Sequence, residues 1–204
     1  MGFYNDHILP RLTHWSLDIG PVAKVRARAL ASAQGIVLEA GFGSGLNLSH
    51  YPASVTRLLA VEPSEVARRM ARKAIARAAF PVEFAGLDGQ SLNLSAASVD
   101  CVVCTFTLCT IPDAARALAE FTRVLKPGGT LLFAEHGLSP EAGVAKWQHR
   151  LNGIQQRIGG GCNLNRRMDA LIGASPLKIT ELDNFHIKGP KTHTYLYVGR
   201  ATKG

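Results

Sequence analysis

The sequence lacks any apolar run that approaches the roughly 20 residues a membrane-spanning helix needs. Its first residues, MGFYNDHILPRL, also lack the long apolar core of a secretory signal. These two absences favour a soluble protein, and we expect it in the cytoplasm without stable insertion in a membrane. The chain has 204 residues, of which 47% are hydrophobic, and this is enough for one domain with one sizeable core.

Cysteine is scarce as well, with four residues in the chain. Cys101 and Cys104 form a C-x-x-C pair, a spacing found in zinc and redox sites. However, 99–106 has the composition of a buried strand, and residues three apart on a strand face opposite sides. Because the two sulfurs cannot converge on such a strand and no second pair of this kind exists, we expect reduced core thiols and no metal site.

Aromatic residues are absent from the most basic part of the chain. The net charge is +8, and much of the excess lies on one predicted helix, at Arg68, Arg69, Arg72, Lys73 and Arg77. Without aromatic side chains between them, these residues indicate a solvated helix face rather than a nucleic-acid surface. We therefore expect no nucleic-acid partner, although a positive surface also attracts anionic substrates.

What the sequence does contain is an alternation of strands and helices. Buried strands are predicted at 36–40, 58–61, 82–85, 99–106 and 130–135. Helices are predicted over 3–31 with a break near Gly20-Pro21, over 63–79, over 113–125 and over most of 136–174. The segments 178–184 and 192–201 have the pattern of an antiparallel hairpin. This order predicts an α/β fold with a doubly wound, mostly parallel, Rossmann-like sheet.

The stretch VLEAGFGSGLN at 37–47 follows the first predicted strand and is the first indication of function. In an open parallel sheet, ligands bind beyond the carboxyl ends of the strands, where this loop should lie. A nicotinamide or flavin site would favour G-x-G-x-x-G, but position 46 is Leu, and no phosphate loop of the form G-x-x-x-x-G-K-[ST] occurs. The form E-x-G-x-G-x-G instead suits a ligand whose amino-acid part and ribose contact the turn without a pyrophosphate.

Two acidic residues follow the second and third predicted strands. Glu62 lies 21 residues beyond Gly41, and a carboxylate there can accept hydrogen bonds from both hydroxyls of a ribose. Pro63 after it suits the start of a helix. Asp88, beside Gly89, could accept a hydrogen bond from an exocyclic adenine amine, although turns also favour Asp and Gly.

Several segments together resemble the class I S-adenosylmethionine-dependent methyltransferases. They are 39–45, Val61-Glu62-Pro63, Asp88, Cys104-Thr105-Phe106-Thr107-Leu108 and Leu125-Lys126-Pro127-Gly128-Gly129. The resemblance implies a seven-stranded sheet with an antiparallel last strand. It also implies S-adenosylmethionine as the methyl donor, which leaves as S-adenosylhomocysteine. The expected cofactor-binding residues are Glu39, Gly41, Gly43, Ser44, Gly45, Asn47, Glu62, Pro63, Asp88, Gly89, Thr105, Phe106 and Leu108.

The same resemblance divides the chain into three parts of a single methyltransferase domain, 1–204. A helical lid is expected at 1–31, a cofactor-binding core at 34–135, and helices of the acceptor pocket with the C-terminal hairpin at 136–204. Nothing in the residues indicates the oligomeric state.

The identity of the methyl acceptor depends on the later segments. CVVCTFTLCTI, AEHG, KWQHRLNG and GGGCNLNR are similar to a small methyltransferase-like group that contains alkyl-thiol S-methyltransferases. The chain also resembles the ubiquinone and menaquinone C-methyltransferases, which share LKPGG. We expect a small thiol acceptor, such as methanethiol or hydrogen sulfide. Quinol C-methylation, N-methylation of a phospholipid or amine, and a non-catalytic cofactor-binding regulator stay open, and a lipid acceptor would bring peripheral association with a membrane.

His136 ends the fifth predicted strand and is the candidate general base that would take the proton of the thiol. The residues expected to line the acceptor pocket are Tyr4, His7, Cys109, Trp147, Cys162 and Arg166. Tyr4 and His7 should share one face of the N-terminal helix. Cys109 is expected as a pocket wall, because direct transfer from a sulfonium needs no covalent intermediate on the enzyme.

Overall fold

Seven strands form one sheet in the order β3-β2-β1-β4-β5-β7-β6 in the computed structural model, which describes residues 2–204. The strands are β1 (Gly35–Ala40), β2 (Val55–Val61), β3 (Val82–Gly86), β4 (Val99–Thr105), β5 (Leu125–His136), β6 (Leu177–His186) and β7 (Tyr195–Lys203). Strands β1 to β5 pair in parallel, whereas β7 is antiparallel to both of its neighbours, β5 and β6. The predicted α/β fold and its antiparallel last strand are confirmed.

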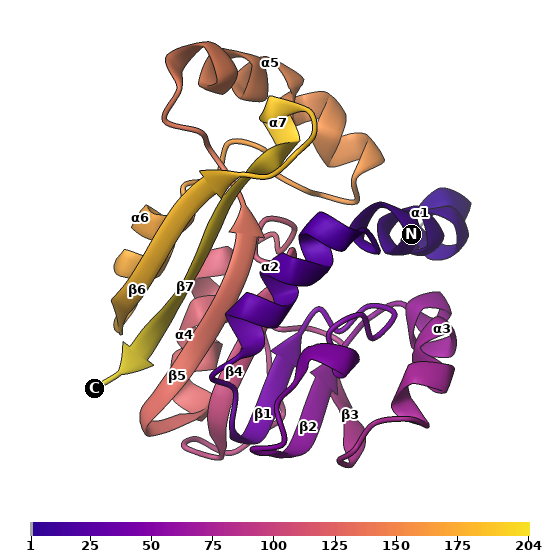
Figure 1. The fold of residues 1–204 in the computed structure, drawn as a ribbon, viewed down its shortest axis with the longest axis vertical. Helices are drawn as coiled ribbons and strands as arrows, with labels where there is room; N and C mark the ends of the chain where they lie inside the picture. The colour runs from indigo at the N-terminus through magenta and orange to yellow at the C-terminus, as the bar shows by residue number, and fades with distance from the viewer. Residues whose placement is uncertain (1) are drawn as a thin grey trace.

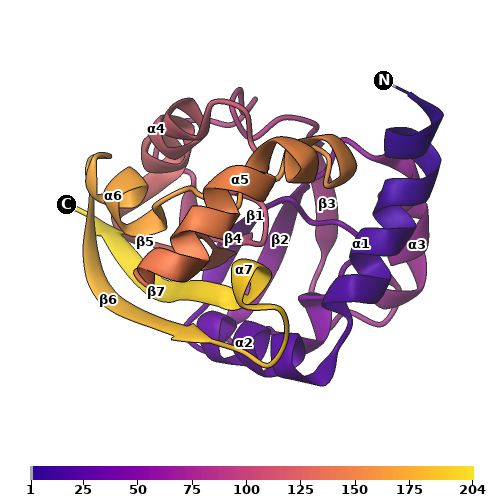
Figure 2. The ribbon, with the colours of Figure 1, turned by 90° about the horizontal axis from the view of Figure 1, so that it is seen from above.

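Helices cover both faces of the sheet and the edge where the strands end (Figure 1). They are η1 (Tyr4–Ile8), α1 (Leu9–Leu17), α2 (Gly20–Leu30), η2 (Leu48–His50), α3 (Glu65–Ile75), α4 (Ala114–Val124), α5 (Ala142–Ile158), α6 (Met168–Gly173) and α7 (Lys191–Thr194). Figure 2 shows α2 on one face, α4 and α6 on the other, and α5 crossing above the strands. Among the described residues, no helix combines the length and the apolar composition that crossing a membrane requires.

Strand β4 shows how the sequence builds a core on both faces of the sheet. Val102 and Cys104 belong to the hydrophobic cluster that contains Phe121 of α4, whereas Cys101 and Val103 belong to a second cluster. All of these side chains are fully buried. Alternate residues of a strand point to opposite faces, so a strand covered on both faces is apolar throughout. The two sulfurs of the C-x-x-C pair therefore lie on opposite faces of the sheet, as predicted.

Helices α3 and α4 begin at polar caps that fix the loops before them. Ser64 Oγ accepts a hydrogen bond from the N–H of Ala67 at 3.2 Å, at the start of α3. Asp113 Oδ1 accepts one from the N–H of Arg116 at 2.9 Å, at the start of α4. Each bond satisfies an N–H group that the first turn of a helix leaves without a partner. The loops between strands and helices are thereby held at the carboxyl edge of the sheet.

The tail of the chain has helix over most of 136–174, as predicted. Its two helices, α5 and α6, are separated by a loop in which Gly160 and Gly161 have positive φ angles. Glycine adopts such angles at little cost and commonly ends helices there. The predicted hairpin is confirmed as β6 and β7, with the single turn α7 before β7. Strand β5 begins at Leu125 rather than near Thr130, because Leu125 already pairs with β4 through a register shift.

Candidate active site

The glycine loop after β1 has three backbone positions that favour glycine. Gly41, Gly43 and Gly45 have φ angles of +74°, +58° and +79°. A Cβ at Gly41 would lie 2.0 Å from Oγ1 of Thr107, and one at Gly45 would lie 3.2 Å from Cδ1 of Leu48. At Gly43 the nearest atom would be 4.0 Å away. Packing within the protein thus accounts for the small size of Gly41 and Gly45, whereas Gly43 leaves space for a ligand beside the backbone.

The carboxylate of Glu62, at the end of β2, holds this loop in place. Its Oε2 accepts a hydrogen bond from the N–H of Gly43 at 2.7 Å, and its Oε1 accepts one from the N–H of Ser64 at 2.7 Å. Burial raises the pKa of Glu62, and the two backbone donors oppose that rise. An ionised carboxylate offers about four acceptor positions, so about two remain for the hydroxyl groups of a ligand. Pro63 is exposed beside it.

A buried polar network lies beneath the loop. Glu39 accepts hydrogen bonds from Nδ2 of Asn47 at 2.9 Å and from the hydroxyl of Tyr51 at 2.7 Å. Arg26 of α2 donates to Oδ1 of Asn47 at 2.7 Å and to Oγ1 of Thr105 at 2.9 Å. Burial raises the pKa of Glu39 to about 7 and lowers the pKa of Arg26. Sequence reasoning missed Arg26, because only the fold shows which arginine of α2 faces inward.

The turn after β4 is shaped by another buried carboxylate, that of Glu135 in β5. It accepts hydrogen bonds from the N–H groups of Thr107 at 2.8 Å, Leu108 at 2.9 Å and Cys109 at 3.3 Å. Phe106 in this turn has a φ of +54°, a strained value for a residue with a side chain. The side chain of Leu108 is fully buried, so we expect it to affect a ligand through the shape of the turn. Sequence reasoning missed Glu135, because its partners are backbone groups that leave no pattern.

Three residues predicted on the acceptor side come together at one point. Sγ of Cys109, Nε2 of His136 and Sγ of Cys162 all lie within 4.8 Å of one another, and the last two atoms are 2.9 Å apart. Burial lowers the pKa of His136, but the contact with Cys162 and the charge of Glu135 outweigh it, and the net pKa is raised. The hydrogen bond with Cys109 and burial raise the pKa of Cys162.

Arg166 and Trp147, also predicted here, differ in position. Arg166 Nη1 donates to the carbonyl of Leu108 and, at 2.9 Å, to that of Ile111, so it fastens the tail to the turn after β4. The side chain of Trp147 is 54% exposed on α5 and is not part of the cluster. Gln148 is the residue of α5 that is buried. The apolar pattern of α5 did not reveal this, because the inward contact is made by an amide.

Besides Arg26 of α2, helices η1 and α1 of the lid form two hydrogen bonds with the segments around the site. His14 Nδ1 lies 2.7 Å from Oγ of Ser44 in the glycine loop, and the hydroxyl of Tyr4 donates to the carbonyl of Ile158 at 2.8 Å. The N-terminal helices therefore bridge the glycine loop and the end of α5. His7 is exposed, and its ring lies 5.0 Å from that of Phe3 in the same lid.

The turn after β3 carries the predicted adenine contact. Asp88 is exposed, and its Oδ1 accepts hydrogen bonds from the N–H and from Nε2 of Gln90 at 2.8 and 2.9 Å. A Cβ at Gly89 would lie 3.5 Å from the ring of Phe121. This geometry is that of a turn closed by its own Asp side chain, and both bonds use a single carboxylate oxygen.

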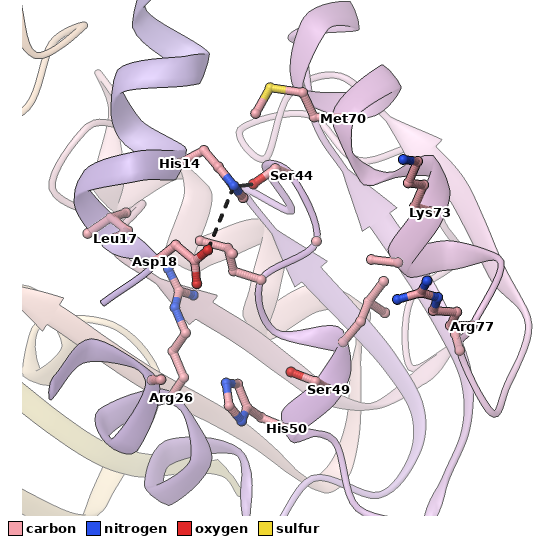
Figure 3. A pocket seen from close by; sticks show the side chains of 16 residues that line it. His14, Leu17, Asp18, Arg26, Ser44, Ser49, His50, Met70, Lys73 and Arg77 are labelled. Carbon is pink, nitrogen blue, oxygen red and sulfur yellow. Dashed lines mark hydrogen bonds and ion pairs between the residues drawn. The ribbon is translucent and has the colours of Figure 1, made fainter. Parts of the chain in front are cut away.

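A cavity of about 560 Å³ lies between the lid, the glycine loop and α3 (Figure 3). The basic side chains in its wall are those of His14, Arg26, His50, Lys73 and Arg77. Its described lining includes neither Glu62 nor Asp88. The cavity is therefore not the space that the ribose prediction requires.

Residues 38–133 match the family described as "Methyltransferase domain". The human thiol S-methyltransferase TMT1A is 34% identical over 173 residues, which cover 79% of this chain and 69% of that protein. The chain belongs to the class I S-adenosylmethionine-dependent methyltransferases. The cofactor predicted for this methyltransferase, S-adenosylmethionine, is confirmed with the family.

Other proteins similar to this methyltransferase are also methyltransferases. The rat thiol S-methyltransferase TMT1B is 36% identical over 134 residues, 64% of this chain and 54% of that protein. The chain thus spans between about half and two thirds of the length of the curated relatives it matches. A solved structure of a SAM-dependent methyltransferase from Methanosarcina mazei has a TM-score of 0.64 at 19% identity, covering 92% of this chain and 99% of that one. At this identity the likeness concerns the fold alone.

Proposed function

We propose that this methyltransferase transfers a methyl group to the sulfur of a small thiol, of the methanethiol or hydrogen sulfide type. The observation that carries the proposal is the identity of 34% and 36% to two thiol S-methyltransferases. The convergence of Cys109, His136 and Cys162 supports it, because these side chains meet where β4 and β5 end. In a sheet of this kind, ligands bind at that edge.

The residues at the other end of the same edge suit the cofactor. Gly43, Glu62 and Asp88 follow β1, β2 and β3, which are neighbours in the sheet. The space beside Gly43 would admit the amino-acid part, the free acceptor positions of Glu62 would take the ribose hydroxyls, and Asp88 would accept from the adenine amine. Nε of Arg26 is buried without a hydrogen-bond partner among the described residues, which suits a bound carboxylate nearby.

The acceptor side has to supply a thiolate in a dry, aligned position. When bound, S-adenosylmethionine supplies a methyl group on a positively charged sulfur. A free thiol with a pKa near 8.5 is only a few per cent ionised at neutral pH, so the protein must favour its anion. His136 is the candidate for that task, and Glu135 fixes the turn that carries Cys109 beside it. Alignment and exclusion of water are then the main contributions of the protein.

The alternatives make different demands on the same region. A quinol ring with its tail would need a wide apolar groove, whereas the cluster is enclosed, with Cys109 and Cys162 only 2% and 8% exposed. N-methylation of a phospholipid would need the site to open toward a membrane surface. A regulator would bind the cofactor and methylate nothing. Cytoplasmic location and the absence of a nucleic-acid partner stay predictions.

The test is methyl transfer from isotopically labelled S-adenosylmethionine in parallel reactions. The acceptors are methanethiol, hydrogen sulfide, a demethylated quinol in detergent and phosphatidylethanolamine vesicles. We expect labelled methyl sulfides from the first two, detected by gas chromatography with mass spectrometry. Label found only in the quinol or the lipid would overturn the thiol assignment. Tight binding of S-adenosylhomocysteine without transfer to any acceptor would support the regulator instead.

Matched histidine variants sharpen this test. His136→Ala should lose turnover of the thiol while keeping its affinity for S-adenosylhomocysteine, because the residue lies on the acceptor side. His149→Ala is the control, since His149 is exposed on α5 and contacts Asn165 at 3.0 Å. Equal turnover of the two variants across the pH range would remove His136 from the proposal.

A further inference from the structure

The cluster of Cys109, His136 and Cys162 contains the atoms that bind transition metals. The three donor atoms come from the turn after β4, from the end of β5 and from the loop after α5, and all lie within 4.8 Å of one another. Around Zn²⁺, with bonds of about 2.3 Å to sulfur and about 2.0 Å to nitrogen, tetrahedral ligand atoms lie about 3.5 to 3.8 Å apart. The observed spacing therefore needs only small side-chain adjustments to meet one ion.

The backbone holds the two cysteines in this arrangement. The carbonyl of Cys109 accepts hydrogen bonds from the N–H and from Nδ2 of Asn163, each at 2.9 Å. The N–H of Cys162 donates to the carbonyl of Gly159 at 3.2 Å, and Nδ2 of Asn163 also donates to the carbonyl of Gly161 at 2.9 Å. Asn163 thus joins the two loops next to both sulfurs. Such fixed supports around the ligands are typical of metal sites.

The donor set indicates both the metal and its use. Two thiolates with one imidazole favour Zn²⁺ over harder cations. Structural zinc sites have four protein ligands, whereas sites with three keep a position open for water or substrate. Among the described residues, no fourth His, Cys, Asp or Glu joins this group. The cluster therefore matches the open kind of site.

We propose that Cys109, His136 and Cys162 bind Zn²⁺ and that its open position binds the sulfur of the acceptor thiol. The second part rests on the proposed thiol methylation. Binding of the metal releases the thiol protons of Cys109 and Cys162 to solvent, and the acceptor loses its own proton to solvent as its sulfur replaces a bound water. A thiol on Zn²⁺ is held deprotonated. As one of the ligands that hold the metal, His136 thereby helps to keep the acceptor in its thiolate form. No atom changes its oxidation state in this step.

The first experiment measures metal binding without activity. Protein purified under a thiol-free reductant, stripped with a chelator, is titrated with Zn²⁺ against a chromophoric competitor and with Co²⁺ in a spectrophotometer. We expect one equivalent of either metal, and for Co²⁺ the thiolate charge-transfer band with the visible bands of tetrahedral coordination. Cys109→Ser, Cys162→Ser and His136→Ala should each weaken Zn²⁺ binding by at least about 100-fold. Cys101→Ala is the control, because Cys101 is buried on the other side of β4.

The second experiment asks whether the open position binds a thiol. Adding methanethiol to the Co²⁺ protein should strengthen the charge-transfer band, whereas methanol should leave it unchanged. Absence of the thiolate band in the wild-type protein, or a disulfide between Cys109 and Cys162 that persists under reductant, would overturn the metal site even if a variant failed to fold. Zinc binding without thiol methylation would overturn the proposed function and, with it, the second part of this inference, whereas the metal site itself would stand. Thiol methylation at full rate by metal-free protein would overturn the second part of this inference.

Discussion

Two loops at the carboxyl edge of the sheet are each held by one buried carboxylate, but the two carboxylates are used differently. Glu62 accepts one backbone N–H on each oxygen and keeps acceptor positions free. Glu135 accepts three backbone N–H groups and lies 3.4 Å from Sγ of Cys104. The first carboxylate is therefore available to a ligand, whereas the second is fully occupied with shaping the turn that carries Cys109.

The largest effect should come from removing the fully occupied carboxylate. Glu135→Ala leaves three buried N–H groups without an acceptor, and each unsatisfied group costs about 1–3 kcal/mol. We expect the free energy of unfolding to fall by about 3–5 kcal/mol, since water can satisfy part of the loss. Urea denaturation measures it. Glu181→Ala, which removes an exposed carboxylate paired with Arg200, is the control. If the free energy of unfolding fell less in Glu135→Ala than in the control, the turn after β4 would be stable without this carboxylate.

Removing the other carboxylate should act on the ligand more than on the fold. Glu62→Ala should weaken binding of S-adenosylhomocysteine by about 1.5–3 kcal/mol, the range for hydrogen bonds to a charged group. Isothermal titration calorimetry measures it. Glu65→Ala is the control, because that carboxylate is 84% exposed three residues further along the chain. Unchanged affinity in Glu62→Ala would mean that the ribose lies elsewhere.

The contrast also explains what the sequence could predict. Gly41 to Gly45 and Glu62 lie in short motifs beside strands whose apolar composition is clear, so their positions follow from local pattern. Cys109, His136 and Cys162 each fitted an acceptor pocket as single residues, but their convergence depends on the path of the loop after α5, which the sequence does not show. The expectation of no metal considered only neighbouring cysteines. A site assembled from three distant segments leaves no spacing to detect.

A third buried carboxylate, Glu39, extends the comparison to the pH dependence of stability. Burial raises its pKa from 4.5 to about 7, so the folded protein holds a proton there that the unfolded chain releases. The stability this proton contributes is fully present below the unfolded pKa and is lost as the pH rises through the folded one. Between about pH 5 and pH 7, we expect wild type to lose about 1–2 kcal/mol relative to Glu39→Gln, which cannot titrate. Urea denaturation of both proteins at each pH gives the difference, and a constant difference would place the proton on another group.

The smallest effect concerns the lid, whose helices bridge the glycine loop and the end of α5. Tyr4→Phe removes the hydrogen bond to the carbonyl of Ile158 and keeps the ring, so about 0.5–1 kcal/mol of lid closure should be lost. If the lid closes over the cofactor, affinity for S-adenosylhomocysteine should fall by about two- to fivefold while the free energy of unfolding stays nearly constant. Ser16→Ala is the control, because it removes an exposed bond to the carbonyl of Thr13 within the same lid. Equal affinities for the two variants would indicate that the contact of the lid with α5 forms independently of the ligand.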